Sequence, residues 1–238
     1  MTTVAITMAG RGQRFRDAGF DVPKWAIEVR GQTLFRWAIE SLQSWIDLGA
    51  HFVLLARKED DPEDFIAREC AAAGIASYEV ILLDATTDGQ ATTALLAAPA
   101  VRERAAPLAI YNIDTHVRPA AMRADRARGD GWIPCFPGVG DAWSFAAADE
   151  EGRVWEVREK ERISPHATVG LYWFGSFALY ADLYERHFAR DAAGERYIAP
   201  MYNTLIEGGG EVHLESLIGD DVIALGTPAE VVRFRGRG

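Results

Sequence analysis

The sequence lacks the residue patterns of several common architectures. Only two of its 238 residues are cysteines, and Cys70 and Cys135 stand in no C-x-x-C or Cys/His pattern. This argues against both a disulfide framework and a zinc site. We expect the two to be buried thiols in a reducing compartment. The five histidines are scattered, and none pairs with another at metal-ligand spacing.

Long apolar runs and a basic excess are also absent. No apolar stretch approaches the roughly 18 to 20 residues of a membrane-spanning helix, and the N-terminal residues do not form a charged leader followed by an apolar stretch. The formal net charge of −10 argues against a surface that binds nucleic acid as a whole. These features predict a cytoplasmic protein without nucleic-acid or membrane partners. Any anionic ligand must then be held by a local cluster of positive groups.

Strand-like and helix-like segments alternate through the first half of the chain, which predicts an α/β domain with a largely parallel central sheet. Strands are expected at Thr3–Met8, His51–Ala56, Tyr78–Leu83 and Pro107–Ile113. Helices are expected at Thr33–Leu48, Pro62–Ala73 and Thr92–Ala98. The spacing of apolar residues in the first of these helices predicts that it lies on the sheet.

The second half of the chain has a different pattern of expected secondary structure. We expect a loop-rich region at Gly129–Gly140, followed by strands near residues 143–147, 154–159 and 168–174 that favour antiparallel pairing. Two helices, one around residues 180–188 and one around 200–207, and a strand-turn-helix at 222–234 complete the pattern. No repeat, low-complexity segment or linker interrupts it, so residues 1–238 are interpreted as one domain.

A segment rich in glycine and arginine, MAGRGQRF, comes directly after the first expected strand. Gly10 and Gly12 allow backbone conformations in which N–H groups turn toward a phosphate, while Arg11, Arg14 and Lys24 add positive charge. Ligands of open α/β sheets bind at the carboxyl ends of strands, where this segment would lie. It completes neither the P-loop pattern nor the G-x-G-x-x-G dinucleotide fingerprint. Alone, it is equally well interpreted as a tight turn with solvated arginines.

Five segments together resemble, in order, the nucleotidyltransferases that make activated sugars and related nucleotide-diphosphate compounds. Ala9-Gly-Arg-Gly-x-Arg-Phe with the later Pro23-Lys24 is similar to their G-x-G-T-R loop and P-K pair. The other four are Asp88-Gly-Gln-Ala-Thr-Thr93, Tyr111-Asn-Ile-Asp114, Glu159-Lys160 with Gly170-Leu-Tyr-Trp-Phe174, and Leu225-Gly-Thr-Pro-Ala-Glu230. The resemblance implies a single three-layer Rossmann-like domain with a mostly parallel mixed sheet. Residues 1–115 would form its nucleotide-binding half and residues 116–238 its acceptor-binding half.

The resemblance also implies a reaction, the transfer of NMP from an NTP to a phosphorylated small molecule with release of pyrophosphate and with Mg²⁺ as cofactor. CTP or another pyrimidine NTP is the favoured donor. Catalysis is assigned to Arg14, Lys24 and Asp114, with Asp114 holding the metal. Nucleotide binding is assigned to Ala9, Gly10, Arg11, Gly12, Gly89 and Gln90. Acceptor binding is assigned to Glu159, Lys160 and Gly170. Phosphoryl-type transfer depends chiefly on positioning and charge stabilisation, which suits this set.

The sequence departs from the family pattern at one functional position. Many relatives place a second metal-binding aspartate two residues before the closing G-T, where this chain has Ala224. Asp220 or Asp221 can substitute from a shifted position, or Asp114 can act with phosphates and water alone. Plainer interpretations remain beside the functional ones. Asp114 can cap a turn, Gln90 can be an ordinary loop amide, and the run EVREKER can be a solvated face.

The acceptor is the least determined substrate. Gly140-Asp-Ala-Trp-Ser-Phe145 and the segments from Glu159 to Phe174 resemble a subgroup associated with capsule and surface-polysaccharide genes, some of whose members use CTP. Sugar 1-phosphates, phosphocholine and phosphorylated amino-acid derivatives are the acceptors considered. Trp143, Trp155, Tyr172 and Trp173 can form an aromatic wall, although core packing is the expected role of at least half of them.

Other functions stay open at this point. A sugar-nucleotide-dependent glycosyltransferase shares the sheet architecture, but Asn112-Ile-Asp114 only partly matches its D-x-D segment. A non-catalytic nucleotide- or sugar-binding module is supported by Ala224. His116 and the arginines near the C-terminal end, Arg233 among them, are interpreted as structural or solvated. The sequence is compatible with a homo-oligomer and does not specify one.

Overall fold

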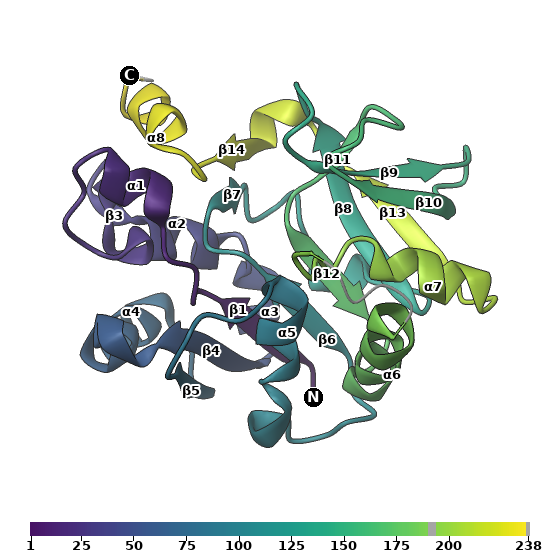
Figure 1. Ribbon diagram of the computed structural model, residues 1–238, viewed down its shortest axis with the longest axis horizontal. Helices are drawn as coiled ribbons and strands as arrows, with labels where there is room; N and C mark the ends of the chain where they lie inside the picture. The colour runs from purple at the N-terminus through teal and green to yellow at the C-terminus, as the bar shows by residue number, and fades with distance from the viewer. Residues whose placement is uncertain (190–193, 237–238) are drawn as a thin grey trace.

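The computed structural model describes residues 1–189 and 194–236 (Figure 1). Its strands are β1 (Thr3–Thr7), β2 (Glu28–Val29), β3 (Gln32–Thr33), β4 (His51–Arg57), β5 (Tyr78–Leu83), β6 (Leu108–Tyr111), β7 (Thr115–Val117), β8 (Gly131–Pro137), β9 (Ser144–Ala148), β10 (Val154–Glu159), β11 (His166–Thr168), β12 (Leu171–Phe174), β13 (Val212–Ser216) and β14 (Val222–Ala224). Its α-helices are α1 (Gln13–Asp17), α2 (Leu34–Glu40), α3 (Gln43–Asp47), α4 (Glu63–Ala73), α5 (Gln90–Leu95), α6 (Phe177–Phe188), α7 (Met201–Glu207) and α8 (Pro228–Arg235).

One mixed sheet runs through the molecule in the order β10-β9-β11-β8-β12-β6-β1-β4-β5, and β13 also pairs with β8. Strands β5, β4, β1 and β6 are parallel neighbours. From β12 onward the pairs are antiparallel, apart from the parallel pair of β13 with β8. The parallel half is thus built from the first half of the chain, as expected, and the antiparallel half from the second.

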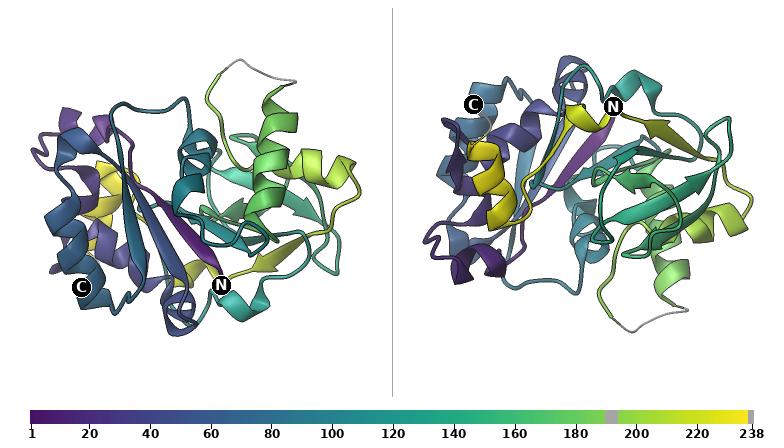
Figure 2. Two further views of the ribbon diagram at one scale, coloured as in Figure 1. Left: turned by 90° about the horizontal axis from the view of Figure 1, so that it is seen from below. Right: turned by 90° about the horizontal axis from the view of Figure 1, so that it is seen from above.

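Two apolar cores lie on opposite faces of this sheet, because successive strand residues point to opposite sides. In β1, Val4 and Ile6 belong to one core and Ala5 to the other. The first core includes residues of α2, α3 and α4, and the second includes residues of α5, α6 and α7. Figure 2 shows the sheet between these two groups of helices. The expectation of a single three-layer Rossmann-like α/β domain is confirmed.

A third, smaller apolar cluster joins the two ends of the chain. Phe15 of α1 and the neighbouring Ile27 and Val29 pack with Val231 and Phe234 of α8. The C-terminal helix therefore lies beside the segment after β1, as Figure 1 shows. Through this contact, residues more than 200 positions apart reach the same side of the molecule.

The expected helix over Thr33–Leu48 is divided in the structure into α2 and α3. The break comes at Ser41, whose hydroxyl donates to the carbonyl of Trp37 and accepts from the backbone N–H of Val117. A serine that bonds back to the preceding turn weakens the regular helix. The hydroxyl therefore serves the contact with β7 rather than the continuity of the helix.

The expectation of a loop at Gly129–Gly140 was wrong, because most of it forms β8 in the middle of the antiparallel half. Gly131 is needed for close packing, since a Cβ there would lie 2.6 Å from the Tyr202 ring. The strand expected over residues 168–174 is likewise two strands, β11 and β12, which separate at Gly170 with φ of +81°. Strand β13 was not foreseen. Both cysteines are buried and free, as expected.

Leu54→Ala tests the packing of the sheet. Leu54 is fully buried in β4, so truncating it leaves a cavity, and we expect the free energy of unfolding to fall by about 2–5 kcal/mol. Leu48→Ala is the matched control, because Leu48 is 70% exposed and the same change there should cost less than about 0.5 kcal/mol. Denaturant unfolding of both variants measures the difference. Equal losses would contradict the described core.

Candidate active site

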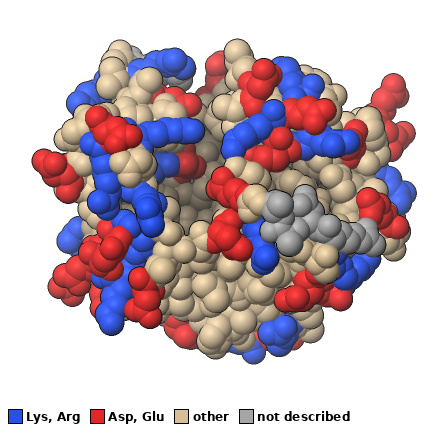
Figure 3. Space-filling model, viewed as in Figure 1, with Lys and Arg blue, Asp and Glu red and all other residues tan. Residues whose placement is uncertain are grey.

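Two adjoining cavities open where β1 and β6 end. The loop cavity, of about 570 Å³, includes Ala9, Gly10 and Arg11 of the glycine-rich segment in its lining. The aromatic cavity, of about 620 Å³, includes Phe136 and Trp143. The residues that line both are Asn112, Asp114, Ser144, Glu159 and Tyr172. Figure 3 shows a hollow between the two sides of the molecule, with Lys and Arg side chains on both of its banks.

The loop after β1 offers a row of backbone donors. Gly12 takes the left-handed conformation, with φ of +61°, and ends the loop as the N-cap of α1. Within residues 1–189 and 194–236, no backbone N–H from Ala9 to Arg14 donates to another backbone or side-chain group. Successive free N–H groups of this kind form the concave sites that bind phosphate. The loop is therefore arranged to hold an anion.

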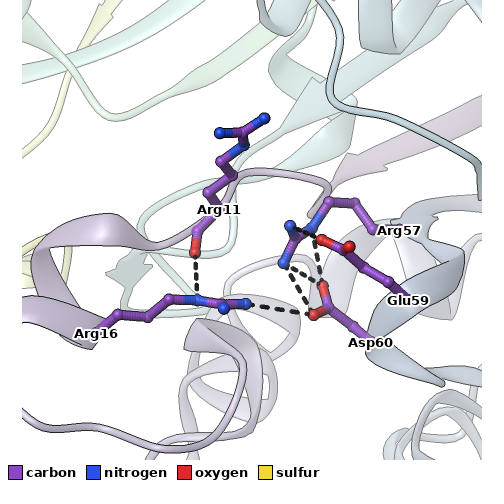
Figure 4. A network of polar contacts seen from close by, with 5 residues as sticks. All are labelled: Arg11, Arg16, Arg57, Glu59 and Asp60. Carbon is purple, nitrogen blue, oxygen red and sulfur yellow. Dashed lines mark hydrogen bonds and ion pairs between the residues drawn. The ribbon is translucent and has the colours of Figure 1, made fainter.

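A buried ion pair on β4 fixes this loop from behind (Figure 4). Arg57 is 5% exposed and donates to Asp60 at 2.8–3.0 Å, and it also contacts Glu59. Asp60 lies 3.7 Å from the guanidinium of Arg16, whose Nε donates to the carbonyl oxygen of Arg11 at 3.1 Å. The side chain of Arg11 points away from this network and lines the loop cavity. The backbone and the side chain of Arg11 thus have separate roles.

Lys24 forms an ion pair with Asp114. Asp114 lines both cavities, whereas Lys24 lines neither and reaches the site through this contact. Lys24 Nζ lies 2.5 Å from Asp114 Oδ2, and the side chains are 16% and 31% exposed. Lys24 begins the 3₁₀ turn η1 (Lys24–Ala26) after Pro23, and Asp114 comes shortly after β6. A Cβ on Gly12 would lie 3.3 Å from the Cβ of Lys24, so the glycine lets the loop pack closely on the lysine.

Ala224, which stands where many relatives have a second metal-binding aspartate, lies in β14. Ala224 of this strand pairs with Thr115 and lines the aromatic cavity together with Asp114. Neither Asp220 nor Asp221 lines either cavity, and Asp221 pairs with Arg118 at 3.1 Å. Shifted replacement by either aspartate therefore has no support. No three His, Cys, Asp or Glu residues among those described form a group that could hold a metal ion.

Glu230 is a carboxylate to which the sequence motifs assigned no role. Its Oε2 lies 3.6 Å from the place a Cβ would take on Gly226, and Asp114 Oδ2 lies 3.4 Å from the same place. The two carboxylates thus flank a glycine whose missing side chain leaves the space between them open. Glu230 also accepts from the Thr227 hydroxyl at 2.9 Å, at the start of α8. Glu230 and Asp114 are far apart in the sequence, so the sequence alone does not show that they lie close together.

Gly89 and Gln90 line the loop cavity at the start of α5. A Cβ on Gly89 would lie 2.3 Å from the carbonyl oxygen of Arg196, so only glycine fits there. Gln90 Nε2 donates to Thr7 Oγ1 at 2.9 Å, and Thr7 donates in turn to the carbonyl oxygen of Tyr111 at 3.3 Å. Because the Thr7 proton is used, its oxygen can only accept, which fixes the orientation of the Gln90 amide.

Asn112 lies at the junction of the cavities and was not assigned from the sequence. Its Oδ1 is buried without a hydrogen-bond partner among the described residues. A Cβ on Gly170 would lie 1.9 Å from its Nδ2, so Gly170 is the residue that makes room for this amide. An unpaired buried amide oxygen is costly unless a ligand or water satisfies it. Asn112 stands two residues before Asp114, and strand residues two apart point to the same side, so the sequence did offer a signal for this residue.

Glu159 lines both cavities, whereas Lys160 lines neither. Glu159 accepts from the Ser144 hydroxyl, and burial raises the pKa of its carboxyl. Lys160 Nζ donates to the hydroxyl of Tyr197 at 2.5 Å, a contact that raises the pKa of the lysine. Tyr197 lines the loop cavity. The structure therefore places the Lys160 ammonium beside the loop cavity and away from the aromatic one.

The four aromatic residues considered for a wall separate into different places. Trp143 and Tyr172 line the aromatic cavity, Trp173 is buried in the first core, and Trp155 is 60% exposed. Of the cationic side chains, Arg14 lines the aromatic cavity and Arg11 the loop cavity.

Two expectations about charged or polar side chains have different outcomes. The interpretation of Arg233 as solvated charge is incomplete, because it also lines the aromatic cavity. His116 is 8% exposed and bonds to the carbonyl of Trp37, which confirms its structural role.

Comparison with solved structures identifies the family. The structure described as the nucleoside-diphosphate-sugar pyrophosphorylase from Vibrio cholerae RC9 is similar over 99% of both chains, with 31% identity and a TM-score of 0.89. The chain belongs to the sugar-nucleotide NTP transferase family. It is thus a nucleotidyltransferase, as the order of its motifs predicted.

Two further structures share the fold of the transferase at lower identity. The inositol-1-phosphate CTP transferase from T. maritima matches with 14% identity and a TM-score of 0.77, over 100% of this chain and 97% of that one. A putative glucose-1-phosphate thymidylyltransferase from Bacillus anthracis, in complex with a sucrose, matches with 16% identity and a TM-score of 0.79, over 99% and 94%. Models of known protein families and curated protein sequences give no match. Among the described residues, no helix is both long and apolar enough to cross a membrane.

Arg16→Met tests whether the transferase needs the network behind its loop. The change removes the hydrogen bond to the Arg11 carbonyl while keeping the length of a half-exposed side chain. We expect NTP to bind about threefold to tenfold more weakly, the range of one lost hydrogen bond. Titration calorimetry measures this, with Arg186→Met as the control, because Arg186 forms a similarly exposed ion pair on α6. If Arg16→Met bound NTP as tightly as the wild type, Arg16 would have no role in holding the loop for the nucleotide.

Proposed function

We propose that this nucleotidyltransferase moves NMP from an NTP, with CTP favoured, to a phosphorylated small molecule and releases pyrophosphate. The observation that carries the proposal is the Lys24–Asp114 pair at the junction of two cavities. One cavity holds the free backbone donors of the loop, and the other holds aromatic and carboxylate groups. We assign the first to the nucleotide and the second to the acceptor. The proposed halves 1–115 and 116–238 each contribute residues to both cavities.

In this mechanism the loop from Ala9 to Gly12 binds the NTP phosphates through its N–H groups, and Arg11 adds a forked donor. Lys24 neutralises the reacting phosphates, and Arg14, at the mouth of the aromatic cavity, holds the charge that develops on the phosphate oxygens. The acceptor's phosphate oxygen attacks the α-phosphorus, and pyrophosphate leaves on the opposite side. A phosphate monoester is already ionised near neutral pH, so no general base is required.

The donor set at the junction fits Mg²⁺, a hard cation that is often held by one or two carboxylates, substrate phosphates and water. Asp114 would hold it, and Glu230 is the other carboxylate beside the open space at Gly226. The ion would supply charge stabilisation for the phosphates. In the structure Asp114 Oδ2 accepts from Lys24, and the carboxylate keeps further lone pairs with which it would hold a cation.

The nucleotide base is placed against Gln90. With its amide NH₂ directed to Thr7, Gln90 keeps Oε1 as an acceptor, and the carboxylate of Glu195 lines the same cavity. Two acceptors favour a base that carries an exocyclic amino group. Among pyrimidines that base is cytosine, since uracil and thymine have a carbonyl oxygen at the corresponding position.

The acceptor is expected to have a phosphate at one end and a polar group at the other. Trp143 and Tyr172 offer aromatic surface beside the Glu159 carboxylate. This combination suits the face of a sugar 1-phosphate, or the cationic head of phosphocholine or of a phosphorylated amino-acid derivative. The resemblance of the segment from Gly140 to Phe145 supports a role in making capsule or surface-polysaccharide precursors.

Pyrophosphate release tests the reaction. CTP, UTP, dTTP, ATP and GTP are each combined with Mg²⁺ and with sugar 1-phosphates, phosphocholine and phosphorylated amino-acid derivatives. We expect Asp114→Ala and Lys24→Ala to lower turnover on the order of 100-fold to 1000-fold, because each removes a charge aimed at the reacting phosphates. Asp125→Ala is the control, since Asp125 is paired with Arg123 on the surface.

Each contrary result has a distinct meaning. Near-wild-type turnover in Asp114→Ala or Lys24→Ala would contradict the assigned active site. NTP binding without product for every acceptor would favour a non-catalytic module. Release of free NDP from a sugar nucleotide would favour a glycosyltransferase.

Thr7→Val tests how the base is recognised. The change keeps the shape of the side chain but removes the hydroxyl that orients Gln90, so the amide can turn and present its NH₂ to the base. We expect the ratio of kcat/KM for CTP over UTP to fall by about threefold to tenfold, the value of one hydrogen bond. Thr3→Val is the matched control at the other end of β1. An unchanged ratio would exclude Gln90 orientation as the source of selectivity.

A further inference from the structure

A line of three hydroxyl groups leads to the carboxylate that the two cavities share. The Tyr172 hydroxyl lies 3.0 Å from Thr168 Oγ1 and 3.2 Å from Ser144 Oγ, and Ser144 donates to Oε2 of Glu159. The four residues come from strands β9, β10, β11 and β12, of which the first three are neighbours and the last is separated from β11 by β8. Thr168, Tyr172 and Ser144 are 2%, 5% and 7% exposed. Hydroxyls this buried need partners, and these three find them in one another.

The direction of these hydrogen bonds is set by chemistry. An ionised carboxylate only accepts, so the single proton of Ser144 is used on Glu159. In its contact with Tyr172 the Ser144 oxygen can then only accept, so Tyr172 is the donor. The Tyr172 oxygen in turn accepts from Thr168. Burial raises the pKa of the Tyr172 hydroxyl, which keeps it a donor. All three O–H bonds therefore point toward Glu159.

The surroundings of Glu159 act on its charge in both directions, and on balance they raise the pKa of its carboxyl. Its side chain is 17% exposed, and burial together with the charge of Glu195 raises its pKa. Lys160 Nζ, 3.9 Å from Oε1, and the Ser144 hydroxyl lower the pKa. Asp114 is the other carboxylate that lines both cavities, and Lys24 pairs with it. The chain of hydroxyls is thus a substantial part of what keeps Glu159 ionised.

We propose that Ser144, Tyr172 and Thr168 are positioning residues whose one-way hydrogen-bond chain holds Glu159 in the cavity as a carboxylate that can only accept. This inference rests on the proposed function for its consequence. The acceptor substrate must offer a hydroxyl or ammonium donor at this end, and an acidic group there is repelled. Acceptor binding weakens as the pH falls through the raised pKa of Glu159, because the protonated carboxyl no longer requires a donor.

The test measures Glu159 itself. In protein labelled with ¹³Cδ-glutamate, the NMR signal of this carboxyl is titrated with pH and assigned by its loss in Glu159→Gln. We expect the midpoint to rise by about 1–2 pH units in Ser144→Ala, which loses a hydrogen bond to a charged group, and by about half as much in Tyr172→Phe. Thr168→Val, at the far end of the chain, should give the smallest rise.

Tyr202→Phe is the matched control. Tyr202 is equally buried, its ring lies 6.2 Å from that of Tyr172, and its hydroxyl donates to the carbonyl of Trp173 at 2.8 Å rather than to the chain. Its midpoint should equal that of the wild type. Equal midpoints in Ser144→Ala, Tyr172→Phe and the wild type would overturn the proposal. A rise of the same size in Tyr202→Phe would also overturn it, because general loosening would then explain the effect.

Kinetics supply the second readout once a substrate pair is known. We expect Tyr172→Phe to raise the KM of the acceptor about threefold to tenfold, more than it raises the KM of the NTP, and to move the acid limb of kcat/KM to higher pH. Equal rises in both KM values would overturn a role specific to the acceptor. If no acceptor of the panel gave pyrophosphate, the result would contradict the proposed reaction alone. The NMR titration would still decide whether the chain of hydroxyl groups controls Glu159.

Discussion

The parallel pairing of β1 with β6 is the constraint on which the site depends. Their register sets Ile6 beside Tyr111, so the two strands end together at the same edge of the sheet. The glycine-rich loop after β1 thereby lines the same cavity as Asp114 after β6. The ion pair between Lys24 and Asp114, 90 positions apart, is a direct result. An anion site can therefore exist on a chain whose net charge is −10, because the positive groups are gathered where these strands end.

The two halves of the sheet contribute different kinds of group. In the parallel half, the loop after β1 offers free N–H donors, whereas the antiparallel strands direct hydroxyl, carboxylate and aromatic side chains into the second cavity. The five residues common to both cavities lie where the two cavities adjoin. This arrangement lets one half change its ligand while the reaction centre between them keeps its geometry.

Much of the fold and the site could be predicted because it depends on local patterns. The period of apolar residues predicted most strands of the parallel half, and the spacing of Gly10, Gly12 and Lys24 pointed to the anion site. Strand β8 was missed because its Gly131 serves tertiary packing against Tyr202, which no local pattern encodes. Asn112 and Glu230 were missed for a related reason. Asn112 lies beside Gly170 of a distant segment, and Glu230 lies near Asp114 across the open space at Gly226, so only the folded chain brings these groups together.

The C-terminal helix has a consequence for how the molecule is made. The loop cavity is lined by residues no later than Ile198, but the aromatic cavity needs Phe234. Phe234 also packs in the cluster that contains Phe15, so these contacts close a loop of more than 200 residues. Contacts of such long range form late, since the entropy of closing the chain must be overcome first. During synthesis from the N-terminus, every residue that lines the loop cavity is made before Phe234, so the aromatic cavity is the later of the two to be completed.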